Sequence, residues 1–232
     1  VEYALGQGSP DAACAVCQLD TAGDVYVQWG RSASCSAGHE TLYTGIVMAE
    51  KSNHYRSEYV CVSSEFETHP QSTASDQDGQ LWYRTETESG SMDENKYPHQ
   101  GEVGCAVCVA PRNVFVHWGS NSCADGSSML YAGIAAGSHH SNRGNGANTL
   151  CLHPNPQRPK GFSTSNHDGA SLFGVEYALG QGSPDAACAV CQLDTAGDVY
   201  VQWGRSDSCS AGHETLYTGI VMAEKSNHYR SE

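Results

Sequence analysis

The chain has 232 residues, of which 26 are acidic and 12 basic, so its formal net charge at pH 7 is −14. This balance argues against partners such as nucleic acid or an anionic membrane, because both need a surplus of Lys and Arg. No apolar run approaches the roughly 18 residues of a membrane span. The 11 cysteines indicate an oxidising compartment, and we therefore expect an extracellular, secreted protein.

The chain repeats itself on two scales. Residues 1–58 return as residues 175–232 with a single difference, Ala33 against Asp207, so the period is 174 residues. Within this period the tetrapeptide CAVC occurs at 14–17 and 105–108, and again at 188–191. After each CAVC come a segment of the form V-Tyr/Phe-V-x-W-G, a single cysteine and an LYxGI segment. The chain is therefore an alternating array of two diverged half-units, which we call A and B.

The repeats define five segments. We interpret the chain as part of a longer tandem array, because the fourth cysteine of the second A copy would fall three residues beyond Glu232. The predicted segments are the core of half-unit A (1–62), a bridging linker (63–104), the core of half-unit B (105–152), a second bridging linker (153–187) and a truncated second half-unit A (188–232).

The apolar pattern predicts strands and little helix. Val25, Val27 and Trp29 alternate with Tyr26 and Gln28, which is typical of a half-buried strand. The LYxGI glycines indicate a bulge or a close backbone approach. The predicted strands are 25–30, 43–49, 58–62, 114–119, 131–137, 148–152 and 199–204. We expect an all-β, sandwich-like fold of tandem half-units stabilised by disulfides.

The cysteines follow the repeat, with four in each complete half-unit. Those of the three copies are Cys14, Cys17, Cys35 and Cys61; Cys105, Cys108, Cys123 and Cys151; and Cys188, Cys191 and Cys209. Four cysteines allow three pairings. Because residues i and i+3 of a strand point to opposite faces, we expect Cys14 and Cys17 to bond separately to Cys35 and Cys61 rather than to each other. The CxxC pairs lie too far apart along the chain for a two-knuckle zinc site.

Several of these motifs resemble the C-terminal domain of sponge short-chain, spongin-like collagens and related invertebrate matrix domains. That family has a GGSH…G-x-N-x-LCLP pattern in one half and CAVC, Cys, EYxGxLM and RTEYVCVD in the other. The matching residues here are Gly137, Ser138, His139, Asn148, Leu150, Cys151 and Leu152, then Cys188, Cys191, Cys209, Tyr217, Gly219, Met222, Arg230, Ser231 and Glu232, with the EYVCV ending at 58–62. The resemblance implies a secreted, disulfide-bonded matrix domain. The chain differs from the family because it lacks any Gly-X-Y stretch, and it therefore contains no collagen triple helix.

Two equivalent polar loops are candidate ligand-binding segments. We call residues 52–58 the A loop and residues 138–145 the B loop. Their candidate ligand residues are His54, Arg56, His139, His140 and Arg143. Such a mixture of aromatic, amide and cationic groups suits a carbohydrate pocket, but it also suits a network of turns around the fourth cysteine.

Other functional motifs are sparse. No metal site is predicted, although Asp76-x-Asp78-Gly79 resembles the start of a calcium loop and weak calcium binding stays open; the Glu expected six residues further on is replaced by Thr85. No nucleophile elbow, zinc-protease or nucleotide-binding motif occurs, so no enzyme is expected. The candidate O-glycosylation sites of a glycoprotein are Ser63, Ser64, Thr68, Ser72, Thr73 and Ser75.

These features favour a structural protein, namely a component of an extracellular fibre or matrix that self-associates or forms an array with neighbouring repeats. Repeats that contact only their neighbours build quasi-one-dimensional arrays. A strand or linker of one half-unit could complete the sheet of the next and cover its edge. The alternative is a secreted tandem-repeat lectin whose partners are glycans, since repeated weak sites gain from multivalency.

Overall fold

The computed structural model describes residues 1–4, 9–70, 72, 79–159, 166–178, 183–205 and 207–225. The described residues form twelve strands and no helix, which confirms the predicted all-β class. Accordingly, nothing in this part of the chain is a helix of the length and apolarity that crossing a membrane requires.

The strands follow the repeat along the chain. Those of half-unit A and the first linker are β1 (Glu2–Tyr3), β2 (Asp24–Trp29), β3 (Glu40–Ala49), β4 (Val60–Ser63), β5 (Leu81–Thr87) and β6 (Gly101–Glu102). Those that follow are β7 (Gly104–Ala110), β8 (Val114–Trp118), β9 (Ser127–Gly137), β10 (Leu150–Leu152), β11 (Ala170–Gly174) and β12 (Ala187–Leu193).

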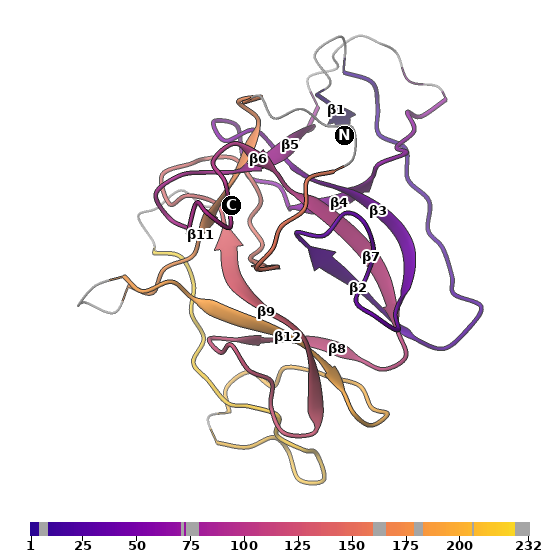
Figure 1. Cartoon of the computed structure of the whole chain (residues 1–232), viewed down its shortest axis with the longest axis vertical. Helices are drawn as coiled ribbons and strands as arrows, with labels where there is room; N and C mark the ends of the chain where they lie inside the picture. The colour runs from indigo at the N-terminus through magenta and orange to yellow at the C-terminus, as the bar shows by residue number, and fades with distance from the viewer. Residues whose placement is uncertain are drawn as a thin grey trace.

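One hydrogen-bonded sheet connects all of these strands, and its two halves have equivalent strand orders. Its order is β2-β7-β3-β5-β11-β9-β12-β8, with β4 on β3 and β10 on β9. The group β2-β7-β3-β4 thus matches the group β8-β12-β9-β10, and the parallel pair of β5 with β11 joins them. Figure 1 shows the first group on the right and the second below it. Four disulfides stabilise this arrangement.

The main hydrophobic core lies between the two halves of the sheet. It combines buried residues of the first half, such as Val47 and Cys105, with Leu150 and Leu152 of β10 and Leu172 of β11. The two half-units therefore share one core, which helps because a unit of about 85 residues is small for burying a core of its own.

Strand β2 has the predicted alternation, but its more deeply buried face is the one that carries Tyr26 and Gln28. Val27 and Trp29 pack against the main core, whereas Tyr26 and Gln28 are only 9% and 2% exposed on the opposite face. The Gln28 side-chain oxygen accepts hydrogen bonds from the backbone N–H and the hydroxyl of Ser36. The loop that carries the single cysteine therefore covers the Tyr26 face and satisfies the buried amide.

The LYxGI motif has the same two functions in both complete half-units. A Cβ on Gly45 would lie 1.9 Å from the Val62 carbonyl oxygen, and one on Gly133 would lie 2.1 Å from that of Leu152. The hydroxyl groups of Tyr43 and Tyr131 each donate a hydrogen bond to the carbonyl oxygen of the fourth cysteine of their half-unit, at 3.0 and 2.9 Å. Glycine is therefore required where the strand with the fourth cysteine closes against LYxGI.

The strand predicted at 199–204 is not formed. The identical sequence at 25–30 forms β2, because β7 lies beside it and supplies hydrogen-bond partners. In the described residues around 199–204 no strand occupies that position. The alternating pattern favours an extended segment, but a strand exists only where a neighbour pairs with it.

Replacing Gly133 by Ala is expected to destabilise the protein by about 1–3 kcal/mol, the usual cost of overpacking. The added methyl group would collide with the backbone of Leu152, which cannot move aside as a flexible side chain could. Urea unfolding followed by tryptophan fluorescence measures the change. The matched control is Gly219→Ala, at the same motif position in the second A copy, where no atom of the described residues lies within 4 Å of the new Cβ. Equal losses of stability in the two variants would contradict the close-approach explanation.

Candidate functional site

The CxxC segments of half-unit B and of the second A copy are central strands in the sheet of the half-unit that precedes each of them. Strand β7 begins half-unit B in the sequence, yet it lies between β2 and β3 of half-unit A and pairs antiparallel with both. Strand β12 of the second A copy lies in the same way between β8 and β9 of half-unit B. We call β7 and β12 donated strands and the half-unit that receives each one its acceptor.

Two disulfides tie each donated strand to its acceptor. The first cysteine of the CxxC bonds the fourth cysteine of the acceptor, and the second bonds the acceptor's single cysteine. The four bonds are Cys61–Cys105, Cys35–Cys108, Cys151–Cys188 and Cys123–Cys191. Since the two cysteines of a CxxC strand point to opposite faces, they reach partners on both sides of the sheet.

The favoured pairing of Cys14 and Cys17 with Cys35 and Cys61 is wrong. Cys35 and Cys61 are bonded to the CxxC of the following half-unit instead. The inference that the cysteines of one CxxC take separate partners still holds in both donated strands. The physical reason is that the CxxC strand β7 lies inside the sheet of half-unit A, so its cysteines are the ones next to Cys35 and Cys61.

Three cysteines form no disulfide within this chain. Cys14 and Cys17 are exposed and Cys209 is half-buried. By the bonding rule of the other copies, a CxxC bonds the half-unit before it and a single cysteine bonds the CxxC after it. Cys14 and Cys17 precede both acceptors in the described residues, and Cys209 follows both donated strands.

The A loop and the B loop lie against each other. The backbone N–H of Ser57 donates to the Asn145 carbonyl oxygen at 2.9 Å, and Arg56 Nη2 donates to the Asn142 carbonyl oxygen at 3.3 Å. Next to the loops, the side chain of Asn148 makes two hydrogen bonds with the backbone of Tyr59. The two candidate ligand-binding loops thus form a joint between the half-units, which uses polar groups that a carbohydrate pocket would need.

The candidate ligand residues lie in this joint or at its border. His54 Nδ1 is 2.8 Å from Glu50 Oε1, and the His54 ring meets Tyr83 edge-on. The rings of His139 and His140 lie 4.1 Å apart, and His139 also contacts Phe173. Arg143 is exposed. His54, Arg56 and His139 thus contact different neighbours, namely Glu50 and Tyr83, the Asn142 carbonyl oxygen, and Phe173.

The remaining sequence candidates divide into described and undescribed residues. Ser63 is in β4, Ser64 donates its hydroxyl proton to the Thr44 carbonyl oxygen, and the hydroxyl of Ser72 accepts from the Asp11 backbone N–H. Thr68 is exposed. Outside the described residues lie Thr73, Ser75 and the calcium-loop candidates Asp76 and Asp78.

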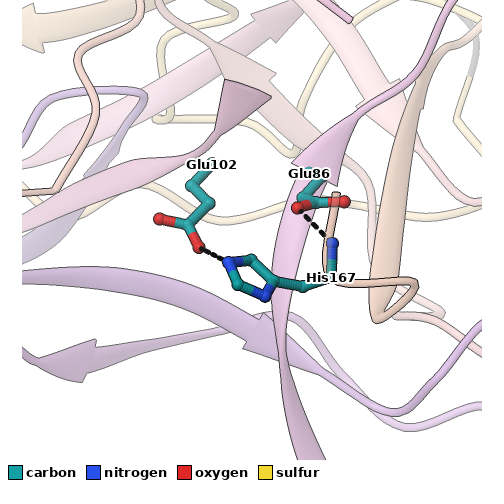
Figure 2. Close-up of side chains that lie close together, drawn as sticks. All are labelled: Glu86, Glu102 and His167. Carbon is teal, nitrogen blue, oxygen red and sulfur yellow. Dashed lines mark hydrogen bonds and ion pairs between the residues drawn. The ribbon is translucent and has the colours of Figure 1, made fainter. Parts of the chain in front are cut away.

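A buried acidic cluster joins the two linkers and was not predicted. Glu86 of β5 and Glu102 of β6 face each other in antiparallel register, and both are nearly fully buried. His167 comes from the other linker: its Nε2 lies 3.4 Å from Glu102 Oε1, and its backbone N–H donates to Glu86 Oε1 at 3.1 Å. Figure 2 shows the imidazole ring pointing towards Glu102, with the backbone nitrogen of His167 below the Glu86 carboxylate. The pairing of β5 with β6 creates this cluster, so no linear motif could have revealed it.

The cluster has the donor set of a divalent-cation site, but a positive side chain already lies in it. One ligand atom each from Glu86, Glu102 and His167 lies within 4.8 Å of the other two. Arg84 Nη1 lies 3.2 Å from Glu102 Oε1 and 3.4 Å from His167 Nε2. A cation would have to displace this guanidinium. The arrangement is therefore best described as a charge network that holds the two linkers together.

No protein-family model and no curated protein matches this chain. The resemblance to the C-terminal domain of spongin-like collagens therefore stays a prediction from the motifs. The four disulfides within the chain indicate an oxidising environment for the folded protein.

Removing one donated-strand disulfide is expected to cost about 2–4 kcal/mol of stability. The variant Cys61→Ala/Cys105→Ala deletes a bond that closes a sequence separation of 44 residues. The matched control, Cys14→Ala/Cys17→Ala, alters the same CxxC motif where it is unpaired and exposed, and should leave stability within about 0.5 kcal/mol. Urea titration of dilute, non-reduced protein provides the comparison. Similar effects of the two double variants would contradict the assigned pairing.

Glu86→Gln is expected to flatten the pH dependence of stability. Burial raises the pKa of Glu86 to about 7, the hydrogen bond from the His167 backbone opposes the rise, and the Glu102 carboxylate adds to it. Because the folded-state pKa lies above the ordinary value of 4.5, the stabilising contribution is complete below pH 4.5 and is lost as pH rises through about 7. The unfolding free energy of the variant should therefore rise relative to that of the wild type as pH rises from 5 to 8. The slope of this rise is the one that linkage gives for a single proton. Unfolding at several pH values, with the exposed Glu94→Gln as control, measures this gain, and parallel profiles for all three proteins would refute it.

Proposed function

We propose that this protein is a structural component of a secreted extracellular fibre or matrix, built by donation of a strand from each half-unit to the one before it. The observation that carries this proposal is that the same donation occurs at both steps present in the chain, from B to A and from the second A to B. A junction that repeats without closing on itself generates an open filament.

The packing next to each donated strand repeats as well. At the first step, Val114 and Leu130 of half-unit B pack against a cluster that contains Tyr26 and Cys108. At the second step, the equivalent Val199 and Leu216 of the second A copy pack against the cluster of Phe115 and Cys191. Each half-unit therefore gives a strand to its predecessor and covers that strand with its own apolar side chains.

The junction is suited to carrying load. Every residue of β7 is buried, and the strand is hydrogen-bonded on both sides and disulfide-bonded at both cysteines. Pulling one half-unit away from the next would require a central strand to leave its sheet and two covalent bonds to break. The A and B loops also support a structural role, because they contact each other.

Chains of one, two and three 174-residue periods test the proposal. We expect the longest dimension, measured by small-angle X-ray scattering and electron microscopy, to grow by equal steps while the cross-section stays constant. Disulfide mapping should show each new CxxC bonded to the half-unit before it. Compact particles, or CxxC bonds confined to one half-unit, would exclude the proposed architecture. Selective, saturable binding on a glycan array would instead favour the lectin alternative.

A further inference from the structure

The two donated strands have the same four central residues, although they enter different acceptors. Strand β7 has the sequence GCAVCVA over 104–110, and strand β12 has the sequence ACAVCQL over 187–193. Both acceptors form disulfides with the first and the second cysteine of CAVC. Figure 1 shows the strands in equivalent places, β7 between β2 and β3 and β12 between β9 and β8. Any selection between the two strands must therefore come from the residues that flank CAVC.

The apolar clusters that cover the two donated strands match member by member except at two positions. The shared members are Ala106 and Ala189, Cys108 and Cys191, Cys35 and Cys123, Val114 and Val199, and Leu130 and Leu216. The differing members are Tyr26 and Ala110 in half-unit A, where half-unit B has Phe115 and Leu193. The larger ring thus accompanies the smaller strand residue, so the two differences compensate each other in volume.

The two differing positions are neighbours on one face of the sheet. Tyr26 lies opposite Cys108, two residues before Ala110 in β7. Ala110 is therefore the diagonal cross-strand neighbour of Tyr26, and such neighbours are within reach of an aromatic side chain. Phe115 and Leu193 are related in the same way in half-unit B.

The Tyr26 ring could not move aside for a larger residue at position 110 without losing polar contacts. Its hydroxyl lies 2.8 Å from His39 Nδ1 and 3.4 Å from Gln28 Oε1, and Ala110 is fully buried. Leu193 is also buried, but it packs in a cluster whose ring has no hydroxyl group to satisfy. Leucine at position 110 would therefore overpack half-unit A, and alanine at position 193 would leave a cavity in half-unit B.

A second difference lies directly before the first cysteine, where β7 has Gly104 and β12 has Ala187. A Cβ on Gly104 would lie 2.4 Å from the Ser32 Cβ and 2.7 Å from the Gln157 carbonyl oxygen. This carbonyl accepts the Gly104 backbone N–H at 3.1 Å, and the Gly104 carbonyl accepts the Gly30 backbone N–H at 2.8 Å. Gly104 is buried, whereas Ala187 is half-buried. Half-unit A therefore requires glycine at this position, and half-unit B has room for a methyl group.

We propose that the residues flanking CAVC decide which acceptor a donated strand enters. Gly104 and Ala110 fit β7 to half-unit A, and Ala187 and Leu193 fit β12 to half-unit B. The inference rests on the proposed function and deepens it, because it names the partner of each acceptor. Half-unit A rejects the strand of another A by steric overlap at two points, and half-unit B holds the strand of another B less tightly because a cavity remains. Arrays therefore grow in alternating order.

The first test exchanges the two donated strands, 104–110 and 187–193, within the 232-residue chain. Because CAVC is common to both, the exchange changes three positions in each strand and leaves the composition of the chain unaltered. Wild type and variant are refolded in mixtures of reduced and oxidised glutathione, and disulfide mapping gives the fraction of each bond. The equilibrium constants of Cys61–Cys105 and Cys35–Cys108 should fall about tenfold, as expected for overpacking.

Single substitutions decide the matter if the exchange variant does not fold. Gly104→Ala should weaken the disulfide of the adjacent Cys105. The matched control Gly137→Ala should leave that bond unchanged, because the atom nearest to its new Cβ, Val175 Cγ2, lies at the ordinary contact distance of 3.6 Å. Gly104→Ala/Ser32→Gly should recover part of the loss when it is compared with Ser32→Gly alone, since the Ser32 Cβ is the closest obstacle.

A double-mutant cycle tests the contact at the other end of the strand. Ala110→Leu should weaken the Cys35–Cys108 bond, and adding Tyr26→Phe should restore part of it, because the pair then reproduces the Phe-Leu combination of half-unit B. Rescue is the decisive readout, since two positions that do not fit against each other directly would show additive losses.

The inference is overturned if the exchange variant forms its four bonds as readily as the wild type, or if both double variants show additive losses. Mapping of the wild type separates this failure from failure of the proposed function. If each wild-type donated strand bonds the half-unit before it and the exchanged strands do so equally well, donation stands and only the selection is refuted. If the wild type lacks these bonds, the fibre architecture is refuted as well.

Discussion

The structure depends on one constraint: the two acceptor strands of a half-unit do not pair with each other, and the strand between them comes from the next half-unit. A strand leaves its backbone N–H and C=O groups to be satisfied by neighbours on both sides. In half-unit A that neighbour is β7, which pairs with β2 along one edge and with β3 along the other. The same sequence without an inserted strand, at 198–205 and 207–222, forms no strand. Folding of one half-unit is therefore coupled to the presence of its successor.

The disulfides convert this coupling into a covalent one. Each bond joins positions between 37 and 73 residues apart, so each closes a long loop and restricts the unfolded chain as well as locking the folded one. The cysteine spacing serves the same purpose, since a CxxC on a strand presents one sulfur to each face. A donated strand is thus held from both faces, and neither bond can form unless the strand has entered the correct acceptor in the correct register.

The linkers explain why the period comprises two half-units. Strands β5 and β11, one from each linker, pair in parallel and join the halves of the sheet. The contact between the A and B loops and the Glu86–Glu102–His167 network lie in the same region, and all three tie A to B. A and B have diverged at positions that serve this pairing. The glycines of the B loop illustrate this, because a Cβ on Gly144 would lie 1.7 Å from the Lys51 carbonyl oxygen.

The sequence by itself determined the all-β class, the repeat, the strands around the motifs of the two complete half-units and the need for glycine in LYxGI. These follow from alternation and spacing, which are local properties of the chain. Only the tertiary structure decided which half-unit receives each CxxC, and therefore which cysteines bond. It also brought Glu86, Glu102 and His167 together and turned two candidate binding loops into a joint. The physical reason is that local pattern specifies the shape of a strand but not its partner. All three CAVC copies have the same sequence, and position in the array alone decides whether a copy is buried in a sheet, as at Val190, or exposed, as at Val16.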